Sequence, residues 1–295
     1  MNLLCDLHTH STFSDGTLSP SQLVSLAVQQ GLGALALTDH NTLAGLPGFR
    51  AAAQGQPLQA IAGVEISSGF AGREVHILGL FLTENMEGPL NSLFQQILER
   101  KDASNRSLVR RLQQAGYRLD YDAICAQHPG TVNRAVMATH LLESGQITSI
   151  QAAIQGILAP GQGYYVPPER TPALEIIDLL HRIGAVPVLA HPYLSLDPDT
   201  LADFLPLARQ QGLAAMETRY STYSPATAAA AKALAEKTGL LESGGSDFHG
   251  SNKPGLSLGR GYGNLAVPMA FAKNLAAWAA GSSGSPLHWT PGEIP

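Results

Sequence analysis

The stretch DLHTHSTFSDGT, residues 6–17, follows directly on the apolar run LLCDL at residues 3–7. Two histidines, His8 and His10, stand on either side of one threonine, and Asp15 comes shortly after them. Side chains alternate in direction along an extended strand, so residues two apart point to the same side. The spacing therefore predicts a first strand that ends by presenting two imidazoles together, with a carboxylate on the loop that follows.

The same pattern of a short apolar run followed by a helical stretch recurs along the chain. Helix start signals are Ser19-Pro20, Thr171-Pro172 and Ser224-Pro225, each ahead of an amphipathic segment. Strands that alternate with helices indicate βα units and a mostly parallel sheet. Seven runs have strand character, which favours a distorted seven-stranded α/β barrel over a small open sheet: residues 3–7, 34–39, 60–67, 75–82, 186–192, 214–218 and 240–247.

The alternation stops between about residue 98 and residue 165, where helical patterns follow one another without a convincing strand. We interpret this segment as an all-helical insertion that divides the barrel into two parts of the sequence. The last segment is rich in Gly, Ser and Pro, which is typical of an irregular tail. The predicted organisation is barrel over 1–98, insertion over 99–165, barrel over 166–280 and tail over 281–295.

Composition limits the classes of function. The 295 residues are 44% hydrophobic and 14% charged, as in a globular protein, and the net charge of −5 gives no general attraction to nucleic acid or to an anionic membrane. No apolar run approaches the ~18 residues of a membrane span. We interpret Cys5 and Cys125 as reduced thiols and expect a cytoplasmic protein without a membrane partner. The sequence indicates no obligatory protein partner.

Chemistry-bearing side chains gather at the predicted strand ends. In a parallel barrel these ends lie on one face, where loops build the active site. Each such residue taken alone is more typical of a structural role, but burying many ionisable groups together is costly unless cations compensate them. The set is imidazole and carboxylate without thiolate, which suits Mn, Fe or Zn, with Mn²⁺ expected first. Nine candidate ligands exceed what one ion can use, so two or three divalent ions are expected. The candidate ligands are His8, His10, Asp15, His40, Glu65, His76, His191, Asp247 and His249.

The motifs DLHTHSTFSDGT, LTDHNT, GVEIS, VHILG, LAHP and GSDFH occur in an order and spacing that resembles the PHP (polymerase and histidinol phosphatase) metal-dependent phosphoesterases. The resemblance covers roughly residues 1–98 and 166–265 and implies the PHP barrel with a trinuclear metal site. It implies that one metal is held by His8, His10, Glu65 and Asp247, a second by Glu65, His76 and His191, and a third by Asp15, His40 and His249.

Within that family, the insertion followed by GQGYYVPPERTPALEIIDLLHRIGAVPVLAHP is similar to the branch of nucleoside 3',5'-bisphosphate phosphatases and 5'-to-3' exoribonucleases. This implies removal of a 3'-phosphate, or trimming of short 5'-phosphorylated RNA, by a metal-activated hydroxide. Arg134 and Arg170 would clamp the substrate's 5'-phosphate, which suits the guanidinium fork. Relatives read closer to G-R-P-H around the first arginine, whereas this chain has Ala135 and Val136 after it.

Two further features of the insertion bear on an RNA substrate. Tyr164 and Tyr165 are candidates to stack a base, or else to pack the insertion on the barrel. Six basic residues would supply a local positive field if they border the pocket, although such a cluster is more often a solvated helix face. They are Arg100, Lys101, Arg106, Arg110, Arg111 and Arg118.

Three alternatives stay open at this point. One is a phosphomonoesterase similar to histidinol phosphatase. Another is an amidohydrolase, a class that also begins with H-x-H on a barrel strand but commonly uses a carboxylated lysine as its metal bridge; all five lysines here lie outside the predicted strand ends. The third is a non-catalytic module with a structural metal site.

Overall fold

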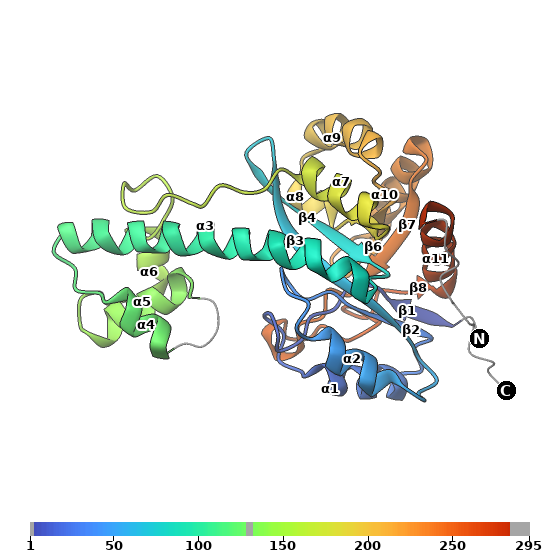
Figure 1. Cartoon of the computed structure of the whole chain (residues 1–295), viewed down its shortest axis with the longest axis horizontal. Helices are drawn as coiled ribbons and strands as arrows, with labels where there is room; N and C mark the ends of the chain where they lie inside the picture. Colours follow the sequence, from blue (N-terminus) through green and yellow to red (C-terminus); the bar gives the residue numbers. More distant parts are fainter. Residues whose placement is uncertain (1–2, 128–131, 284–295) are drawn as a thin grey trace. The chain divides into compact units, whose positions relative to one another are not determined.

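The computed structural model of the chain describes residues 3–127 and 132–283. The chain divides into two compact units (Figure 1). The barrel unit comprises Met1–Ser92 and Arg170–Pro295, and the helical unit comprises Leu93–Glu169. Within the described ranges, no helix has both the length and the apolar character needed to span a bilayer.

The barrel unit is built on one mixed sheet. Its strands lie in the order β7-β6-β5-β4-β3-β2-β1-β8, and β1, β2 and β3 pair in parallel, as do β5, β6 and β7. Their bounds are β1 Leu4–Asp6, β2 Ala34–Leu37, β3 Gln59–Phe70, β4 Arg73–Leu80, β5 Val186–Leu189, β6 Ala215–Tyr220, β7 Leu241–Gly245 and β8 Val267–Pro268.

Strand β4 departs from the predicted parallel arrangement. It pairs antiparallel with both β3 and β5, because β3 and β4 form a long hairpin that turns at Ala71 and Gly72, both with positive φ. His76 lies in the first half of β4. The reversal of the strand therefore brings His76 to the same end of the sheet as Glu65 on β3.

The two flanks of the sheet meet, so the predicted barrel is confirmed. The Leu7 amide donates to the Gly244 carbonyl at 3.2 Å, and the Asp247 amide donates to the His8 carbonyl at 2.9 Å, which joins β7 to the end of β1. The sequence predicted seven strands; the eighth, β8, has two residues and pairs antiparallel with β1.

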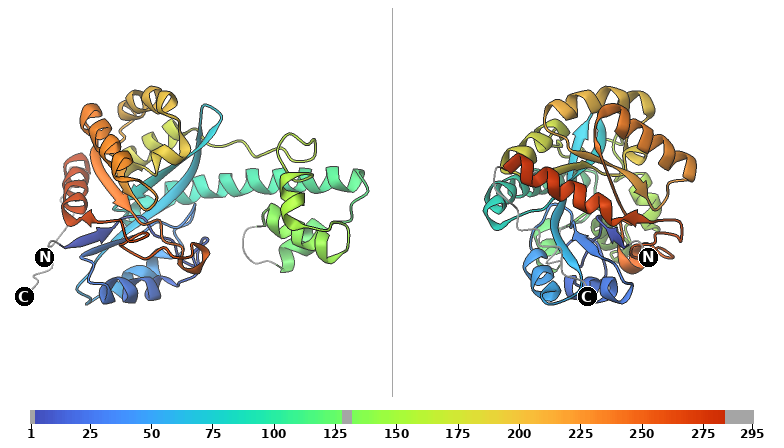
Figure 2. Two further views of the ribbon diagram at one scale, coloured as in Figure 1. Left: turned by 180° about the vertical axis from the view of Figure 1, so that it is seen from behind. Right: turned by 90° about the vertical axis from the view of Figure 1, so that its right-hand side faces the viewer.

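Helices cover the outside of the barrel unit, as the right-hand view of Figure 2 shows. The helix start predicted at Ser19 is present, with a capping box at the start of α1, and Ser224 caps α10 by accepting from the Thr227 amide. Helix α7 begins after Pro172, without a side-chain cap. The bounds are α1 Pro20–Gln29, α2 Leu46–Ala53, α7 Ala173–Ile183, α8 Pro192–Ser195, α9 Pro198–Gln210, α10 Pro225–Thr238 and α11 Met269–Ser283, with short 3-10 turns at Glu84–Met86 and Gly250–Asn252.

Helix α11 supplies part of the barrel core. Phe271 and Leu275 pack in one buried cluster with strand residues such as Cys5, Val186 and Leu78. This apolar cluster lies among the strands and α11, so the polar residues at the strand ends are separate from the hydrophobic core. The tail predicted over 281–295 begins within α11, and from residue 284 onward it lies outside the described residues.

The helical unit contains most of a long helix, α3. This helix begins at Glu87, before the boundary that the sequence predicted between residues 98 and 99. Its own buried cluster includes Leu108, Leu112, Met137 and Leu141. Amphipathic helices that share such a core stabilise one another. The bounds are α3 Glu87–Gln114, α4 Tyr121–Gln127, α5 Arg134–Glu143 and α6 Ile150–Gln155.

Gly245 at the end of β7 lies against His8, and we expect its lack of a side chain to be essential for the position of His8. A methyl group added there would lie 2.4 Å from the His8 Cβ and 2.6 Å from its amide nitrogen. We expect Gly245→Ala to lower the free energy of unfolding by about 1–3 kcal/mol, measured by denaturant titration. Gly48→Ala is the matched control, because its methyl group meets no atom within 4 Å and α2 should gain helix propensity. Equal stability of the two variants would contradict the close approach.

Candidate metal centre

A single buried carboxylate organises the site. Glu65, in the middle of β3, has its side chain 1% exposed and lies within 3.2 Å of five imidazoles. Its Oε2 faces His8 Nε2 at 3.1 Å, His10 Nε2 at 3.2 Å and His40 Nδ1 at 3.2 Å, while its Oε1 faces His76 Nδ1 at 2.8 Å and His191 Nε2 at 3.1 Å.

Local backbone structure explains this convergence. Thr9 points away from its two neighbours and donates from Oγ1 to the Ala36 carbonyl at 2.6 Å, so His8 and His10 face the same side, as the spacing predicted. His40 forms a parallel bridge with Glu65 just beyond the end of β2. His191 and Asp247 follow β5 and β7 with positive φ angles, a strained conformation that is typical of functional sites.

Two more carboxylates extend the cluster. Asp247 Oδ1 lies 3.2 Å from His10 Nε2 and 3.6 Å from His8 Nε2. Asp15 is more exposed, and its Oδ1 lies 3.1 Å from His249 Nε2 while its Oδ2 lies 3.9 Å from His40 Nε2. All nine predicted ligands are thus brought into one connected cluster.

Three buried nitrogens in the cluster have no hydrogen-bond partner: His8 Nε2, His10 Nε2 and His40 Nδ1. Each lies close to Glu65 Oε2 without the alignment of a hydrogen bond. Unpaired buried polar atoms are rare and call for a partner. Imidazole nitrogens and carboxylate oxygens that face a shared point are the donor set of a divalent ion, so the residues present fit a metal centre.

Burial and opposite charges both act strongly on the pKa values of the cluster. Burial alone would raise the pKa of Glu65, but the imidazoles of His8 and His40 outweigh it and hold that pKa well below its ordinary value. Burial would lower the pKa of His76, but the charge of Glu65 raises it to about 10. Burial lowers the pKa of His40 to about 4, which leaves a neutral imidazole, the form that binds metals.

Three subsets have ligand atoms that all lie within 4.8 Å of one another. They are His8, His10, Glu65 and Asp247; His10, Asp15, His40 and His249; and His40, Glu65 and His76. The first matches a predicted set. The second adds His10 to a predicted set, and the third has His40 where the prediction has His191, which nevertheless contacts the same Glu65 oxygen as His76.

Sequence reasoning missed several residues that hold these side chains. Glu217 on β6 lies 3.1 Å from His8 Nδ1, and Asp39 accepts from the Ser11 amide at 2.7 Å. Tyr220 donates to Asp247 Oδ2 at 2.6 Å and Lys253 contacts the same oxygen at 2.5 Å. A lone acid in the apolar run AAMET was the available signal for Glu217, as it was for Glu65 in GVEIS.

Arg170 is linked to the cluster through the side chain of Glu74. Its Nη2 donates to Glu74 Oε2 at 2.8 Å, and Glu74 Oε1 lies 3.3 Å from His76 Nε2. The hydrogen bond from His76 and the charge of Arg170 lower the pKa of Glu74 to about 2. A cavity of about 600 Å³ opens here, lined by Arg73, Glu74, His76, His191, Leu194, Ser195, Tyr220 and Asp247.

Arg134 and the two tyrosines belong to the helical unit. Arg134 is the first residue of α5, donates to the Leu158 carbonyl at 2.9 Å and lies over the Tyr165 ring at 4.7 Å. Tyr164 and Tyr165 are half-buried and pack against the core of the same unit. The structure therefore brings Arg134 and Tyr165 together, while both tyrosines also contribute to packing.

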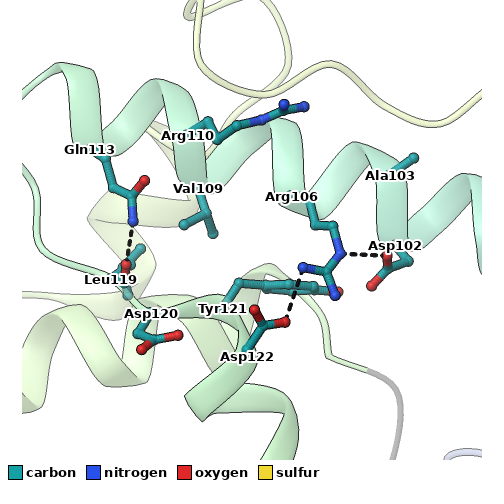
Figure 3. Close-up of a pocket in the computed structure, with 10 residues that line it drawn as sticks. All are labelled: Asp102, Ala103, Arg106, Val109, Arg110, Gln113, Leu119, Asp120, Tyr121 and Asp122. Carbon is teal, nitrogen blue, oxygen red and sulfur yellow. Dashed lines mark hydrogen bonds and ion pairs between the residues drawn. The ribbon is translucent and has the colours of Figure 1, made fainter.

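Part of the basic cluster is engaged in structural contacts. Figure 3 shows Arg106 between Asp102 and Asp122, at 2.7 and 3.0 Å, with its guanidinium 4.9 Å from the centroid of the Tyr121 ring. Arg111 donates to the Gly163 carbonyl at 3.2 Å. The cavity of about 800 Å³ in this figure carries carboxylates as well as arginines, so its lining is not a uniformly basic surface.

Comparison with known proteins identifies the family. Residues 6–158 match the PHP domain family. The chain belongs to the PHP family. A relative, the 5'-3' exoribonuclease Rnm of Salmonella typhimurium, is 35% identical over 262 residues, covering 88% of this chain and 89% of the relative. The 3',5'-nucleoside bisphosphate phosphatase of Chromobacterium violaceum is 30% identical over 257 residues, covering 86% of this chain and 90% of the relative.

Solved structures agree with the PHP assignment. A proposed metal-dependent phosphoesterase from Bifidobacterium adolescentis superimposes with a TM-score of 0.72 at 26% identity, covering 93% of this chain and 96% of the other. A Chromobacterium violaceum protein named an amidohydrolase, solved with sulfate and without metal, gives 0.70 at 26% identity, with 93% and 96% covered. The predicted family, fold and phosphoric ester hydrolase class are confirmed.

Removal of divalent metal should destabilise this PHP protein. A ligand that binds only the folded state at about 100 times its Kd stabilises it by about 2.7 kcal/mol. We expect Mn²⁺ or Zn²⁺ added to chelator-treated protein to raise Tm by roughly 5–10 °C per site, measured by scanning calorimetry. His10→Ala should lose most of this shift, whereas His181→Ala, outside the cluster beside Trp278, should keep it. No shift in the wild-type protein would contradict the metal centre.

Proposed function

We propose that this chain hydrolyses the 3'-phosphate of nucleoside 3',5'-bisphosphates, trims short 5'-phosphorylated RNA from its 5' end, or does both. The observation that carries the proposal is the convergence of five imidazoles on the Glu65 carboxylate, in a barrel whose relatives named above act on such substrates. An anionic phosphate ester suits this site because a cluster of divalent cations attracts and orients its oxygens.

Two to three divalent ions, Mn²⁺ first and Fe or Zn as alternatives, would be held by the nine ligands. One ion would be held by His8, His10, Glu65 and Asp247. A second would be held by Glu65, His76 and His191, and a third by Asp15, His40 and His249. When bound, these ions supply activation of water for attack on phosphorus and neutralisation of the phosphoryl charge. Glu65 has an oxygen toward each side of the cluster, which supports its role as a bridge.

Residues around the ligands orient them and the substrate. Tyr220 and Lys253 hold Asp247 Oδ2, which leaves Oδ1 turned toward the imidazoles. Arg170 lies beside the cavity that borders His76 and His191, and its guanidinium would bind a substrate phosphate there in exchange for, or alongside, its contact with Glu74. Leu194 on the cavity wall is 59% exposed and offers an apolar surface to a base or sugar.

The proposal includes the substrate-binding residues predicted in the helical unit, which the contacts within that unit support. Arg134 would contact the 5'-phosphate, and the ring of Tyr165 would hold its guanidinium in place by the cation–π contact at 4.7 Å. Tyr164 and Tyr165 would also offer aromatic surface to a base.

An amidohydrolase of the carboxylated-lysine type is less well supported. Lys253 contacts Asp247 from the outer side, at the oxygen that faces away from His10, and Glu65 already supplies a bridging carboxylate. The donor set around Glu65 in the described part of the chain is therefore imidazole and carboxylate.

A hydrolysis panel with Mn²⁺ tests the function, with released phosphate measured for the phosphomonoesters and the products separated by chromatography for the RNA and the amide. It compares nucleoside 3',5'-bisphosphate, mononucleotides, histidinol phosphate, 5'-phosphorylated short RNA and a cyclic amide. We expect the bisphosphate or the RNA to be hydrolysed fastest, and His249→Ala to lose more than about 100-fold in rate while retaining its fold by circular dichroism. Faster turnover of histidinol phosphate or of the amide would favour those alternatives, and no turnover of any compound would favour a non-catalytic module.

Arg134→Ala and Arg170→Ala test the phosphate clamp. A charge-assisted hydrogen bond contributes about 1.5–3 kcal/mol, so each variant should raise KM for a 5'-phosphorylated substrate by roughly 10- to 100-fold. The same substrate without its 5'-phosphate should show little change. Arg182→Ala, which removes an exposed arginine paired to Asp178 one turn earlier on α7, is the control. Equal effects on both substrates would remove the clamp from the proposal.

A further inference from the structure

Glu217 is a fully buried carboxylate that is not among the nine predicted ligands. It lies in the middle of β6, with its side chain 0% exposed. Each of its oxygens has a separate partner at the metal centre. Oε1 lies 3.1 Å from His8 Nδ1, and Oε2 accepts from the backbone amide of His191 at 2.6 Å.

The first contact fixes which nitrogen of His8 carries a proton. A carboxylate only accepts hydrogen bonds, so the contact requires a proton on Nδ1. The opposite nitrogen, Nε2, is buried, lacks a hydrogen-bond partner and faces Glu65 and Asp247. With Nδ1 protonated, Nε2 is the nitrogen whose lone pair is available to a cation.

The second contact stabilises an unfavourable backbone conformation. His191 has φ of 30° and ψ of 54°, in the left-handed region that a residue with a side chain rarely adopts. The short hydrogen bond from its amide to Glu217 helps to hold this conformation, which directs the ring to within 3.1 Å of Glu65 Oε1. One carboxylate thus reaches ligands on both sides of Glu65.

We propose that Glu217 is a positioning residue for the metal centre, which fixes the tautomer of His8 and the backbone of His191 and so couples two metal positions. The inference rests on the metal centre of the proposed function but not on its substrate. Loss of such an outer contact typically lowers metal affinity by about 10- to 100-fold. Because Glu217 supports ligands assigned to two ions, its loss should weaken both.

Glu217→Gln is the sharpest test because it preserves shape and removes only the second acceptor. If the amide oxygen faces His8, the amide NH₂ group meets the His191 N–H, donor against donor. If the amide group is reversed, its NH₂ faces His8 and forces the proton onto Nε2, where the cation must bind. Either orientation breaks one of the two contacts.

The experiment titrates chelator-treated full-length protein with Mn²⁺ and with Zn²⁺ against a competing chelator. We expect Glu217→Gln to bind at least one ion with about 10- to 100-fold lower affinity. Glu242→Gln on the neighbouring strand is the matched control, because Glu242 contacts the Thr218 hydroxyl rather than an imidazole, and it should bind as the wild type does. Wild-type affinity and stoichiometry in Glu217→Gln would overturn the inference.

A second measurement does not require the variant to fold. In wild-type protein loaded with diamagnetic Zn²⁺, long-range proton–nitrogen correlation spectra should find the His8 proton on Nδ1. A proton on Nε2 would overturn the inference. Wild-type protein that binds no metal would instead refute the metal centre itself, and metal binding without hydrolysis of either the bisphosphate or the RNA would count against the proposed substrates alone.

Discussion

The structure depends on the burial of one negative charge. Glu65 is removed from water in the middle of a strand, a position that costs several kcal/mol unless opposite charge compensates it. Five imidazoles surround it, two from the end of β1, one from the end of β2, one from within β4 and one from the end of β5. The fold that buries apolar residues between the strands and α11 also brings the histidines into contact at the strand ends. Bound cations compensate the crowded ionisable groups better than protons do, because one cation accepts several lone pairs at once.

Precise placement of these groups comes from close backbone contacts as much as from the ligands themselves. Gly245 lets β7 approach His8, and the hydrogen bonds between the β1 and β7 ends keep His8 and Asp247 side by side. The β3–β4 hairpin brings His76 to Glu65 from the opposite strand direction. Outer contacts from Glu217 to His8 Nδ1, and from Tyr220 and Lys253 to Asp247 Oδ2, leave the other polar atom of each of these two side chains facing the cluster.

The barrel and the gathering of polar side chains at its strand ends could be predicted from the sequence, because the relevant signals are local. The H-x-H spacing, the strand runs and the helix starts at Ser19 and Ser224 depend on neighbours in the chain, and they predicted the barrel and the clustering of polar side chains at its strand ends. The direction of β4 could not be read, since a short apolar run looks the same in either orientation. The role of Glu217 was also hidden, because its partners, His8 and His191, are distant in sequence and meet only after the barrel closes. The predicted start of the helical insertion, between residues 98 and 99, does not coincide with the start of a helix, because α3 continues across it without a break.

The charge of the ligand set argues for an anionic substrate. The clustered ligands include three carboxylates, Asp15, Glu65 and Asp247, and the remainder are neutral imidazoles when they bind metal. Three divalent ions would bring a charge of six against these three negative charges, and the buried Glu217 carboxylate beside His8 would lower the excess by only one. The exposed side chain of Asp15 marks the solvent-facing part of the cluster, where the excess positive charge is least screened by protein. A phosphate ester that enters there supplies the missing negative charge, so the composition of the site favours phosphoryl chemistry over the hydrolysis of a neutral amide.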